Sequence, residues 1–243
     1  MSSASTTEGG TRRVAGWEAP PSFYPARDRL ALMALIAIPA ALVALVVAVL
    51  TGFWWLGALL LGLWIVKTVA EALWTDVVIL KRLRARRLHA HEAPRLVNLV
   101  SGIAGDLGVG SPRLYVLDSD GANALIASGG ANGILAVTKP LVDDFTRTEL
   151  EAVVAHCLLR LHSKNFVYSN LAARWSDLGA GLAPRVGIAD DVKAAALTRY
   201  PPALAAAIEK CDENVRLYAP LWFVSNAPSH DPSADRAAAV ADL

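Results

Sequence analysis

Two long apolar runs near the start of the chain dominate its pattern of hydrophobic and polar positions. The first spans residues 30–50 without a charged side chain, and about 20 such residues are enough for a helix to cross a bilayer core. The second spans residues 53–72, and only Thr51 and Gly52 separate it from the first. The pattern therefore predicts a hairpin of two transmembrane helices over residues 29–74.

The stretch before this hairpin, residues 1–28, is rich in Ser, Thr, Gly and Pro and has no hydrophobic periodicity, so it predicts a disordered tail. Two alternatives exist for the apolar runs, namely a signal peptide and a buried core hairpin. The apolar region of a signal peptide is about 7–15 residues long and lies close to the N-terminus. The length of the first run, and the tail before it, favour the membrane hairpin.

Basic residues flank the hairpin on both sides. They are Arg12, Arg13, Arg27 and Arg29 before it, and Lys81, Arg82, Arg84, Arg86 and Arg87 after it. Cytoplasmic loops of membrane proteins carry an excess of Lys and Arg. The distribution therefore predicts a multi-pass protein of the cell membrane whose termini and main domain are all cytoplasmic.

The second group of cations lies within residues 75–91, which we expect to form a basic juxtamembrane helix. Two interpretations remain open for it. The cations could bind anionic lipid headgroups, each contributing about 1 kcal/mol near the surface, or they could simply fix the topology. A nucleic-acid partner is not expected, because no aromatic residues interleave the cations and the net charge of the whole chain is only +1.

The remaining residues, 92–243, alternate between helical and strand-like patterns. Apolar residues recur at helical spacing up to Gly108, and Thr146 and Glu149 have the spacing of a capping box for a helix running to about Leu161. The predicted class is α+β, mostly helical with a small β-sheet. Strands are expected at 113–117, 124–127 and 134–138, and further helices at 165–178, 189–198, 201–218 and 234–240.

The helix that follows the capping box carries the sequence His156-Cys157-Leu158-Leu159-Arg160. Zinc proteases use His-Glu-x-x-His in such a helix, since two His one turn apart bind Zn²⁺ and the Glu is general base for the metal-bound water. Here Arg160 has no lone pair to give to a metal, and Cys157 is not a carboxylate. The sequence therefore predicts a protease-like helix without the protease chemistry.

Several short segments occur in an order that resembles the HtpX-type membrane zinc metalloproteases of the gluzincin class. The resemblance covers roughly residues 90–243, and the predicted membrane hairpin suits the same family. The segments that carry it are Pro112 to Leu117, Asn123-Ala124-Leu125, Ile134 to Thr138, Glu149 to His156, Ala189-Asp190, Tyr200 to Leu204, Ala207 to Lys210, His230-Asp231-Pro232 and Arg236. It implies a zincin-like fold for residues 92–243, as a cytoplasmic metalloprotease-like domain.

When the family's catalytic set is carried over to this sequence, it is incomplete. The first His ligand maps to His156, the general base to Cys157 and the second His ligand to Arg160. The downstream Glu ligand lies four residues before the family's Asp and maps to Val186. No glutamate lies in the window where the last ligand would be found. We therefore expect no catalytic residues and no zinc cofactor, with His156 as the only retained ligand position.

The resemblance also implies a mode of binding that needs no catalysis. In such proteases the edge strand that contains Asn-Ala pairs with the substrate backbone, and strand addition of this kind needs no metal. Asn123, Ala124 and Leu125 are therefore candidates for binding an extended peptide, the alternative being a plain sheet edge.

Together these patterns predict a membrane-anchored pseudoprotease that contacts membrane lipid and binds a peptide or membrane-protein partner without cleavage. Two alternatives remain, a residual membrane metalloendopeptidase with non-standard ligands around His156 and a structural subunit of a membrane complex. A thiol enzyme at Cys157 is disfavoured, because His156 projects about 100° away from it around the helix. Cys157 and Cys211 are expected to be free thiols.

Overall fold

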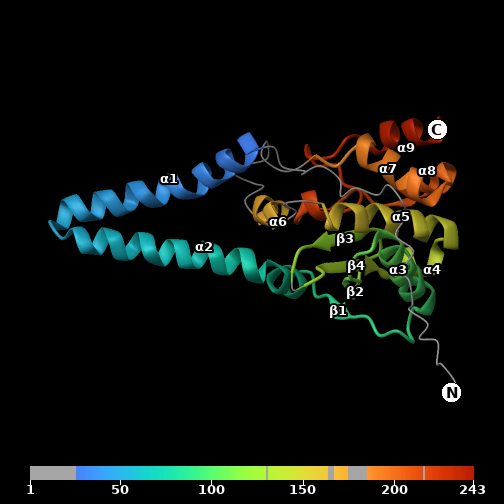
Figure 1. The fold of residues 1–243 in the computed structure, drawn as a ribbon, viewed down its shortest axis with the longest axis horizontal. Helices are drawn as coiled ribbons and strands as arrows, with labels where there is room; N and C mark the ends of the chain where they lie inside the picture. The colour runs from blue at the N-terminus through green and yellow to red at the C-terminus, as the bar shows by residue number, and fades with distance from the viewer. Residues whose placement is uncertain (1–25, 130, 164–166, 175–184, 216) are drawn as a thin grey trace, which may run out of the picture.

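Two long helices run side by side away from one end of an α+β domain (Figure 1). The computed structural model describes residues 26–129, 131–163, 167–174, 185–215 and 217–243. α1 (Ala26–Thr51) and α2 (Trp54–Arg82) are joined by a tight turn in which Gly52 adopts a φ of 70°. The predicted two-helix hairpin and α+β class are confirmed. Of the expected tail, residues 1–25 lie outside the described residues, and residues 26–28 belong to α1.

The surface of the hairpin is strongly apolar. Val49, Leu50 and Trp54 are 72%, 80% and 78% exposed, and many other large apolar side chains of α1 and α2 are also exposed. Apolar surface of this extent is unusual for a soluble domain and suits the hydrocarbon of a bilayer. Within the described residues, Leu30–Thr51 and Trp54–Glu71 are long and apolar enough to cross one.

A four-stranded mixed sheet lies inside the domain, in the order β1-β2-β4-β3. β2 (Arg113–Leu117), β3 (Ala124–Ala127) and β4 (Ile134–Thr138) coincide with the three predicted strands. β2 is parallel to β4, whereas β3 is antiparallel to β4 with Leu125 opposite Ala136. Every residue of β3 and β4 is buried, which explains why their sequences are continuous apolar runs.

The basic segment after the hairpin differs from the prediction of a helix over residues 75–91. α2 ends at Arg82, and Arg84 then reverses the chain with a φ of 52°. Arg86–Arg87 form β1, which pairs antiparallel with β2. The helix prediction was wrong here because Arg and Lys are good helix formers, whereas the pairing with β2 is a tertiary contact that the local pattern does not contain.

Helices pack around the sheet and complete the core. They are α3 (Pro94–Leu107), α4 (Lys139–Asp144), α5 (Arg147–Leu161), α6 (Val167–Arg174), α7 (Ile188–Thr198), α8 (Pro201–Lys210) and α9 (Ser233–Ala241), with a 3-10 turn η2 (Ala219–Leu221). α5 begins at the predicted capping box, in which Thr146 and Glu149 each accept from the other's backbone amide. Because α5 packs against α3, α7, α8 and β3, it is buried along almost its whole length.

α6 lies between the hairpin and the sheet (Figure 1). Asn170 donates to the backbone oxygen of Ser128 at 2.7 Å, just beyond β3, and accepts from the amide of Ser128 at 3.2 Å. On its other side, Leu171 and Ala172 pack with Leu32 and Ile36 of α1. α6 therefore links the base of the hairpin to the edge of the sheet.

Two predicted helices have different bounds in the structure. Within the helix expected over 165–178, the structure describes α6 alone. The other residues of that range lie outside the described residues. The helix expected over 201–218 ends at Lys210, after which Cys211 is extended with φ −76° and ψ 145°. This extended backbone leads the chain back to the sheet, where the contacts below are made.

Candidate functional site

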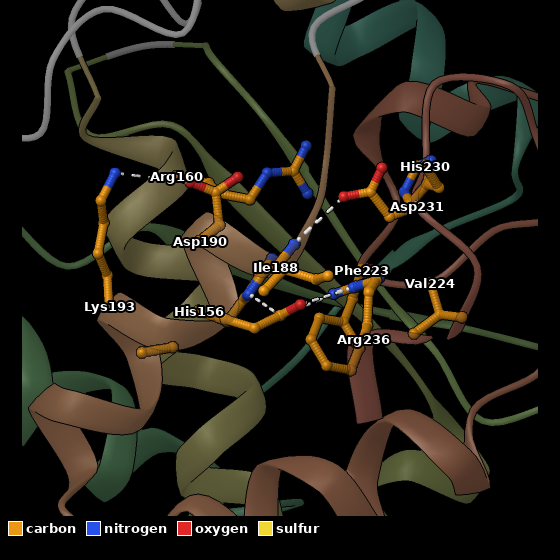
Figure 2. Close-up of polar contacts among 12 residues, drawn as sticks. His156, Arg160, Ile188, Asp190, Lys193, Phe223, Val224, His230, Asp231 and Arg236 are labelled. Carbon is orange, nitrogen blue, oxygen red and sulfur yellow. Dashed lines mark hydrogen bonds and ion pairs between the residues drawn. The ribbon is translucent and has the colours of Figure 1, made fainter. Parts of the chain in front are cut away.

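One face of α5 points His156 and Arg160 into a buried polar cluster (Figure 2). The two residues are one helical turn apart, so their side chains lie on the same side of the helix, and both are completely or almost completely buried. The other members of the cluster are Asp190 and Asp191 of α7, Arg236 of α9 and His230 in the loop before α9.

Asp191 is the charged centre of this cluster. Arg236 donates to both carboxylate oxygens of Asp191, through Nε at 2.7 Å and Nη2 at 2.8 Å. The same carboxylate lies 3.0 Å from Nδ1 of His156. Burial would raise the pKa of Asp191, but Arg236 and His156 outweigh burial and lower that pKa to about 2. Asp191 is therefore ionised at neutral pH, and Arg236 balances its charge.

His156 is held as a neutral imidazole. Burial lowers its pKa, and the neighbouring Asp191 only partly opposes that shift. Its ring meets the ring of Phe223 edge-on, with centroids 4.9 Å apart. Among the described residues, Nε2 of His156 has no hydrogen-bond partner. The residue thus keeps the form of a metal ligand.

Arg160 places a permanent cation where the resemblance expects a second His ligand. Its Nη1 donates to the backbone oxygen of Trp222 at 3.1 Å, and its Nη2 donates to that of Pro220 at 2.9 Å. Asp190 supplies a nearby carboxylate, although burial raises the pKa of Asp190. The guanidinium is therefore engaged with backbone carbonyls of the same chain.

A second buried histidine, His230, faces the same backbone. Its Nε2 lies 3.1 Å from the oxygen of Trp222, and its Nδ1 lies 3.2 Å from the hydroxyl of Ser229. Burial lowers the pKa of His230 to about 3, and the charge of Arg160 adds to that effect. The neutral ring therefore donates from Nε2 and accepts at Nδ1, so the carbonyl of Trp222 receives two donors.

The two aspartates at the start of α7 differ in their contacts. The resemblance matches Asp190 to the family's Asp, which places the ligand position four residues earlier, at Val186. In the structure it is Asp191 that contacts His156 of α5 and Arg236 of α9. Four residues before Asp191 lies Gly187, which has no side chain.

A glutamate at either position would displace neighbouring side chains in the observed backbone. A Cβ atom on Gly187 would lie 2.0 Å from Oδ2 of Asp231, and that carboxylate accepts from the amide of Ile188 at the start of α7 at 3.4 Å. Val186 is fully buried and forms a parallel bridge with His230. The segment before α7 is therefore fixed by packing and capping contacts.

These residues do not fit a bound zinc ion. Zinc sites in proteins use three or four N, S or O ligands, and the positions assigned by the resemblance supply only His156. Arg160 adds a positive charge that repels a divalent cation. The described part of the chain also contains no group of three His, Cys, Asp or Glu side chains arranged to hold a metal ion.

The thiol of Cys157 is chemically inert at neutral pH. Burial raises the pKa of Cys157 to about 12, and the nearby Arg160 and Arg236 only partly oppose this shift. Cys211 is likewise buried and unpaired with another cysteine, and burial raises its pKa. Both cysteines are free thiols, as predicted, and neither is present as a thiolate nucleophile.

The predicted peptide-binding edge is not open. Asn123, Ala124 and Leu125 are buried although β3 is the last strand of the sheet. Trp222 forms an antiparallel bridge with Leu125, and the amide of Phe223 donates to the oxygen of Ala124 at 2.8 Å. The segment that covers this edge lies about 100 residues away in the sequence, so the local pattern around Asn123 does not reveal it.

The basic flank lies on the surface at the domain end of α2. All five of its cations, Lys81, Arg82, Arg84, Arg86 and Arg87, are exposed. Arg86 forms an ion pair with Glu92 at 2.6 Å. The flank is therefore separate from the buried cluster, which contains none of these residues.

Two residues of the buried cluster are not singled out by the sequence pattern. Asp191 contacts His156, and His230 lies against the backbone oxygen of Trp222. Arg236 of α9 and Asp191 of α7 are charged residues that are fully buried. A charged residue on the apolar face of a predicted helix is the sequence signal that could have identified them. Such residues are almost never buried unless they are paired.

The structure is an α+β domain on an apolar hairpin, with His156 on one helix, Asp191 facing it from a later helix, and a small mixed sheet with an antiparallel edge strand. The chain is 30% identical over 203 residues to the "Protease HtpX homolog" of Dictyoglomus thermophilum, covering 62% of this chain and 67% of that protein. It is 30% identical over 208 residues to that of Dictyoglomus turgidum, covering 64% and 68%. It is 33% identical over 101 residues to that of Thermococcus sibiricus, covering 41% and 35%.

The chain therefore belongs to the HtpX-type protease family. No family model matches it, and no solved structure matches it. Family membership and the two exposed apolar helices together indicate a membrane protein.

Proposed function

We propose that this protein is a catalytically inactive member of its family, a membrane-anchored pseudoprotease that holds an extended peptide segment without cleaving it. The observation that carries the proposal is the pair of hydrogen bonds from Arg160 to the backbone oxygens of Pro220 and Trp222. A cation at this place binds peptide carbonyls but cannot generate a hydroxide nucleophile as zinc does.

The remaining chemistry of the cluster supports the same proposal. Peptide hydrolysis at a zinc site needs a carboxylate base beside the metal-bound water. The corresponding residue, Cys157, is a buried thiol. The carboxylate that does face His156, that of Asp191, is fully engaged by Arg236. The cluster therefore suits binding and structural support.

The first prediction is that the protein purified in detergent contains much less than one zinc per chain and does not cleave casein. The physical reason is that one imidazole next to a guanidinium cannot hold Zn²⁺ tightly. Metal analysis and a casein assay with and without a chelator measure this. Zinc near one equivalent together with chelator-sensitive cleavage would instead favour the residual metalloendopeptidase, for which the unpartnered Nε2 of His156 is the structural argument.

Reversion variants sharpen that measurement. Cys157→Glu returns a base without a metal, and Arg160→His supplies a second imidazole without the downstream ligand. Two triple variants combine these changes with either Val186→Glu or Gly187→Glu. Each then has two His ligands, a Glu ligand and a Glu base. Because a Cβ atom at Gly187 would meet the carboxylate of Asp231, and Val186 is fully buried, we expect both triples to bind zinc weakly and to remain inactive.

The membrane arrangement is also part of the proposal. Both ends of the hairpin carry cations, so we place the tail and the main domain in the cytoplasm, with the turn at Gly52 on the other side. The exposed flank from Lys81 to Arg87 would then face the anionic inner leaflet, where it could attract lipid headgroups.

A topology measurement checks this arrangement. Reporter fusions after residue 28 and after residue 90 are both expected to give a cytoplasmic signal, and a fusion at Gly52 is expected to give an extracytoplasmic one. As a matched control, exchanging the cations of the flank for Gln should reduce the cytoplasmic signal of the fusion after residue 90. An extracytoplasmic signal at residue 28 or 90 in the native sequence would rule out the hairpin.

A further inference from the structure

The segment from Ala219 to Val224, here called the strap, lies along the outer edge of β3. Its direction is antiparallel to the strand, since Trp222 bridges Leu125 in antiparallel fashion and the amide of Phe223 donates to the oxygen of Ala124. This is the geometry by which an extended peptide is added to a sheet. The strap therefore occupies the place that a bound peptide would take.

Asn123 fixes one end of the strap by hydrogen bonds that do not depend on the strap's side chains. Its Nδ2 donates to the oxygen of Val224 at 2.8 Å and to that of Asp212 at 2.7 Å. Its Oδ1 accepts from the amide of Val224 at 3.4 Å. An amide side chain that contacts only backbone groups would accept another extended segment equally well.

Three donors from the buried cluster contact the other side of the strap. Arg160 donates to the carbonyls of Pro220 and Trp222, His230 donates to that of Trp222, and Arg236 donates to that of Phe223 at 2.9 Å. The side chain of Phe223 packs between His156 and Arg236, whose guanidinium carbon lies 5.4 Å from the centre of the ring. The strap is thus held between the sheet edge and the cluster, and Figure 2 shows Phe223 beside His156 and Arg236.

We propose that the strap is an exchangeable internal ligand, and that a partner binds this protein by replacing it on β3 with an extended segment of similar chemistry. The inference deepens the proposed function and rests on it, because an active protease would cleave a peptide held here. The partner segment needs two successive large apolar residues, which match the buried positions of Trp222 and Phe223, and then a small or β-branched residue.

Space beside the strap supports exchange. A cavity of about 320 Å³ adjoins Trp222 and is also lined by Leu83, Leu117 and Leu217. The space borders the indole ring, whose Nε1 donates to the oxygen of Leu217 at 2.9 Å. The strap has the advantage of being tethered, since a tethered ligand competes at an effective concentration on the order of millimolar. A free peptide should therefore bind only after the strap is weakened.

The experiment uses the full chain in detergent and a fluorescent synthetic peptide with the sequence of residues 217–226. Arg160→Met removes two hydrogen bonds from the strap while keeping an apolar side chain in the space. Lys210→Met is the matched control, because it also breaks a pair, with Glu149 at 2.5 Å, and does not contact the strap. Hydrogen exchange at the amide of Phe223 and fluorescence anisotropy of the peptide are measured for each protein.

For Arg160→Met we expect amide exchange at Phe223 to rise at least about tenfold and the peptide to bind saturably at micromolar concentration. The native protein and Lys210→Met should show neither change. Unchanged exchange, or equal peptide binding by the native protein, would overturn the proposal. So would a loss of protection that extends to β2 and β4, since Arg160 would then be a general packing residue.

A second variant covers the case in which Arg160→Met does not fold. Asn123→Ser removes the clamp on Val224 from the opposite side, and the same local rise in exchange with peptide binding is expected. The zinc and casein measurements are independent of these results. Zinc-dependent cleavage would refute the proposed function, whereas a strap that does not exchange would refute only this inference.

Discussion

Replacing Arg236 by Met should destabilise the domain by about 3–5 kcal/mol, the largest effect expected for a single substitution in this chain. Arg236 is completely buried and makes two hydrogen bonds to Asp191 and one to the oxygen of Phe223. Without it the carboxylate of Asp191, whose pKa lies at about 2 in the native protein, would be a buried charge with only the neutral ring of His156 as a partner. Chemical unfolding of the full chain in detergent measures the loss.

Two further variants separate the charge effect from simple loss of packing. Asp191→Asn combined with Arg236→Met removes both charges and should recover part of the stability lost by Arg236→Met alone. Arg86→Met breaks the ion pair with Glu92, which is on the surface, and should leave the stability nearly unchanged. If Arg236→Met proved as mild as Arg86→Met, the buried cluster would not be the electrostatic centre described above.

Mild acid should destabilise the domain, and His230 is expected to account for much of the effect. Its pKa is about 3 in the native protein, against an ordinary value of 6.5, because burial disfavours the charged ring. Between these two values the unfolded chain binds one more proton than the native chain, so stability falls as the pH falls. The loss is about 1.4 kcal/mol per pH unit, or about 2 kcal/mol between pH 6.5 and pH 5.

Other groups modify this pH dependence. Burial also lowers the pKa of His156, which adds to the loss of stability below pH 6.5. The pKa of Asp191 is depressed, so its contribution is lost only as the pH falls from about 3.8 towards about 2. Burial raises the pKa of Asp190, so this residue acts in the opposite direction and favours the native state as the pH falls through that raised pKa towards the ordinary value of about 3.8.

His230→Gln is the matched control for the acid effect. A Gln side chain can still donate a hydrogen bond to the oxygen of Trp222, but it does not titrate. The variant should therefore lose about 2 kcal/mol less than the native protein between pH 6.5 and pH 5. Melting temperatures recorded across this range measure the difference. An identical pH dependence in the two proteins would mean that His230 is not the group that is protonated on unfolding.

The sequence by itself determined the elements whose signal is local. The apolar runs predicted the hairpin, the three short apolar runs coincide with β2, β3 and β4, and the pair Thr146 and Glu149 predicted the start of α5. Length, hydrophobic period and capping are properties of neighbouring residues, so no tertiary information is needed to recognise them. That position 157 holds Cys where a base would be Glu, and position 160 holds Arg where a ligand would be His, is equally a property of the sequence alone.

Only the tertiary structure decided which residues meet. That Asp191 and not Asp190 faces His156 depends on the rotation of α7, a difference of one residue that the pattern of α7 does not resolve. That β1 replaces a predicted helix, and that the strap covers β3, depend on backbone pairing between segments distant in the sequence. Hydrogen bonds between backbone groups are available to every residue, so the sequence leaves their partners open until the chain has packed.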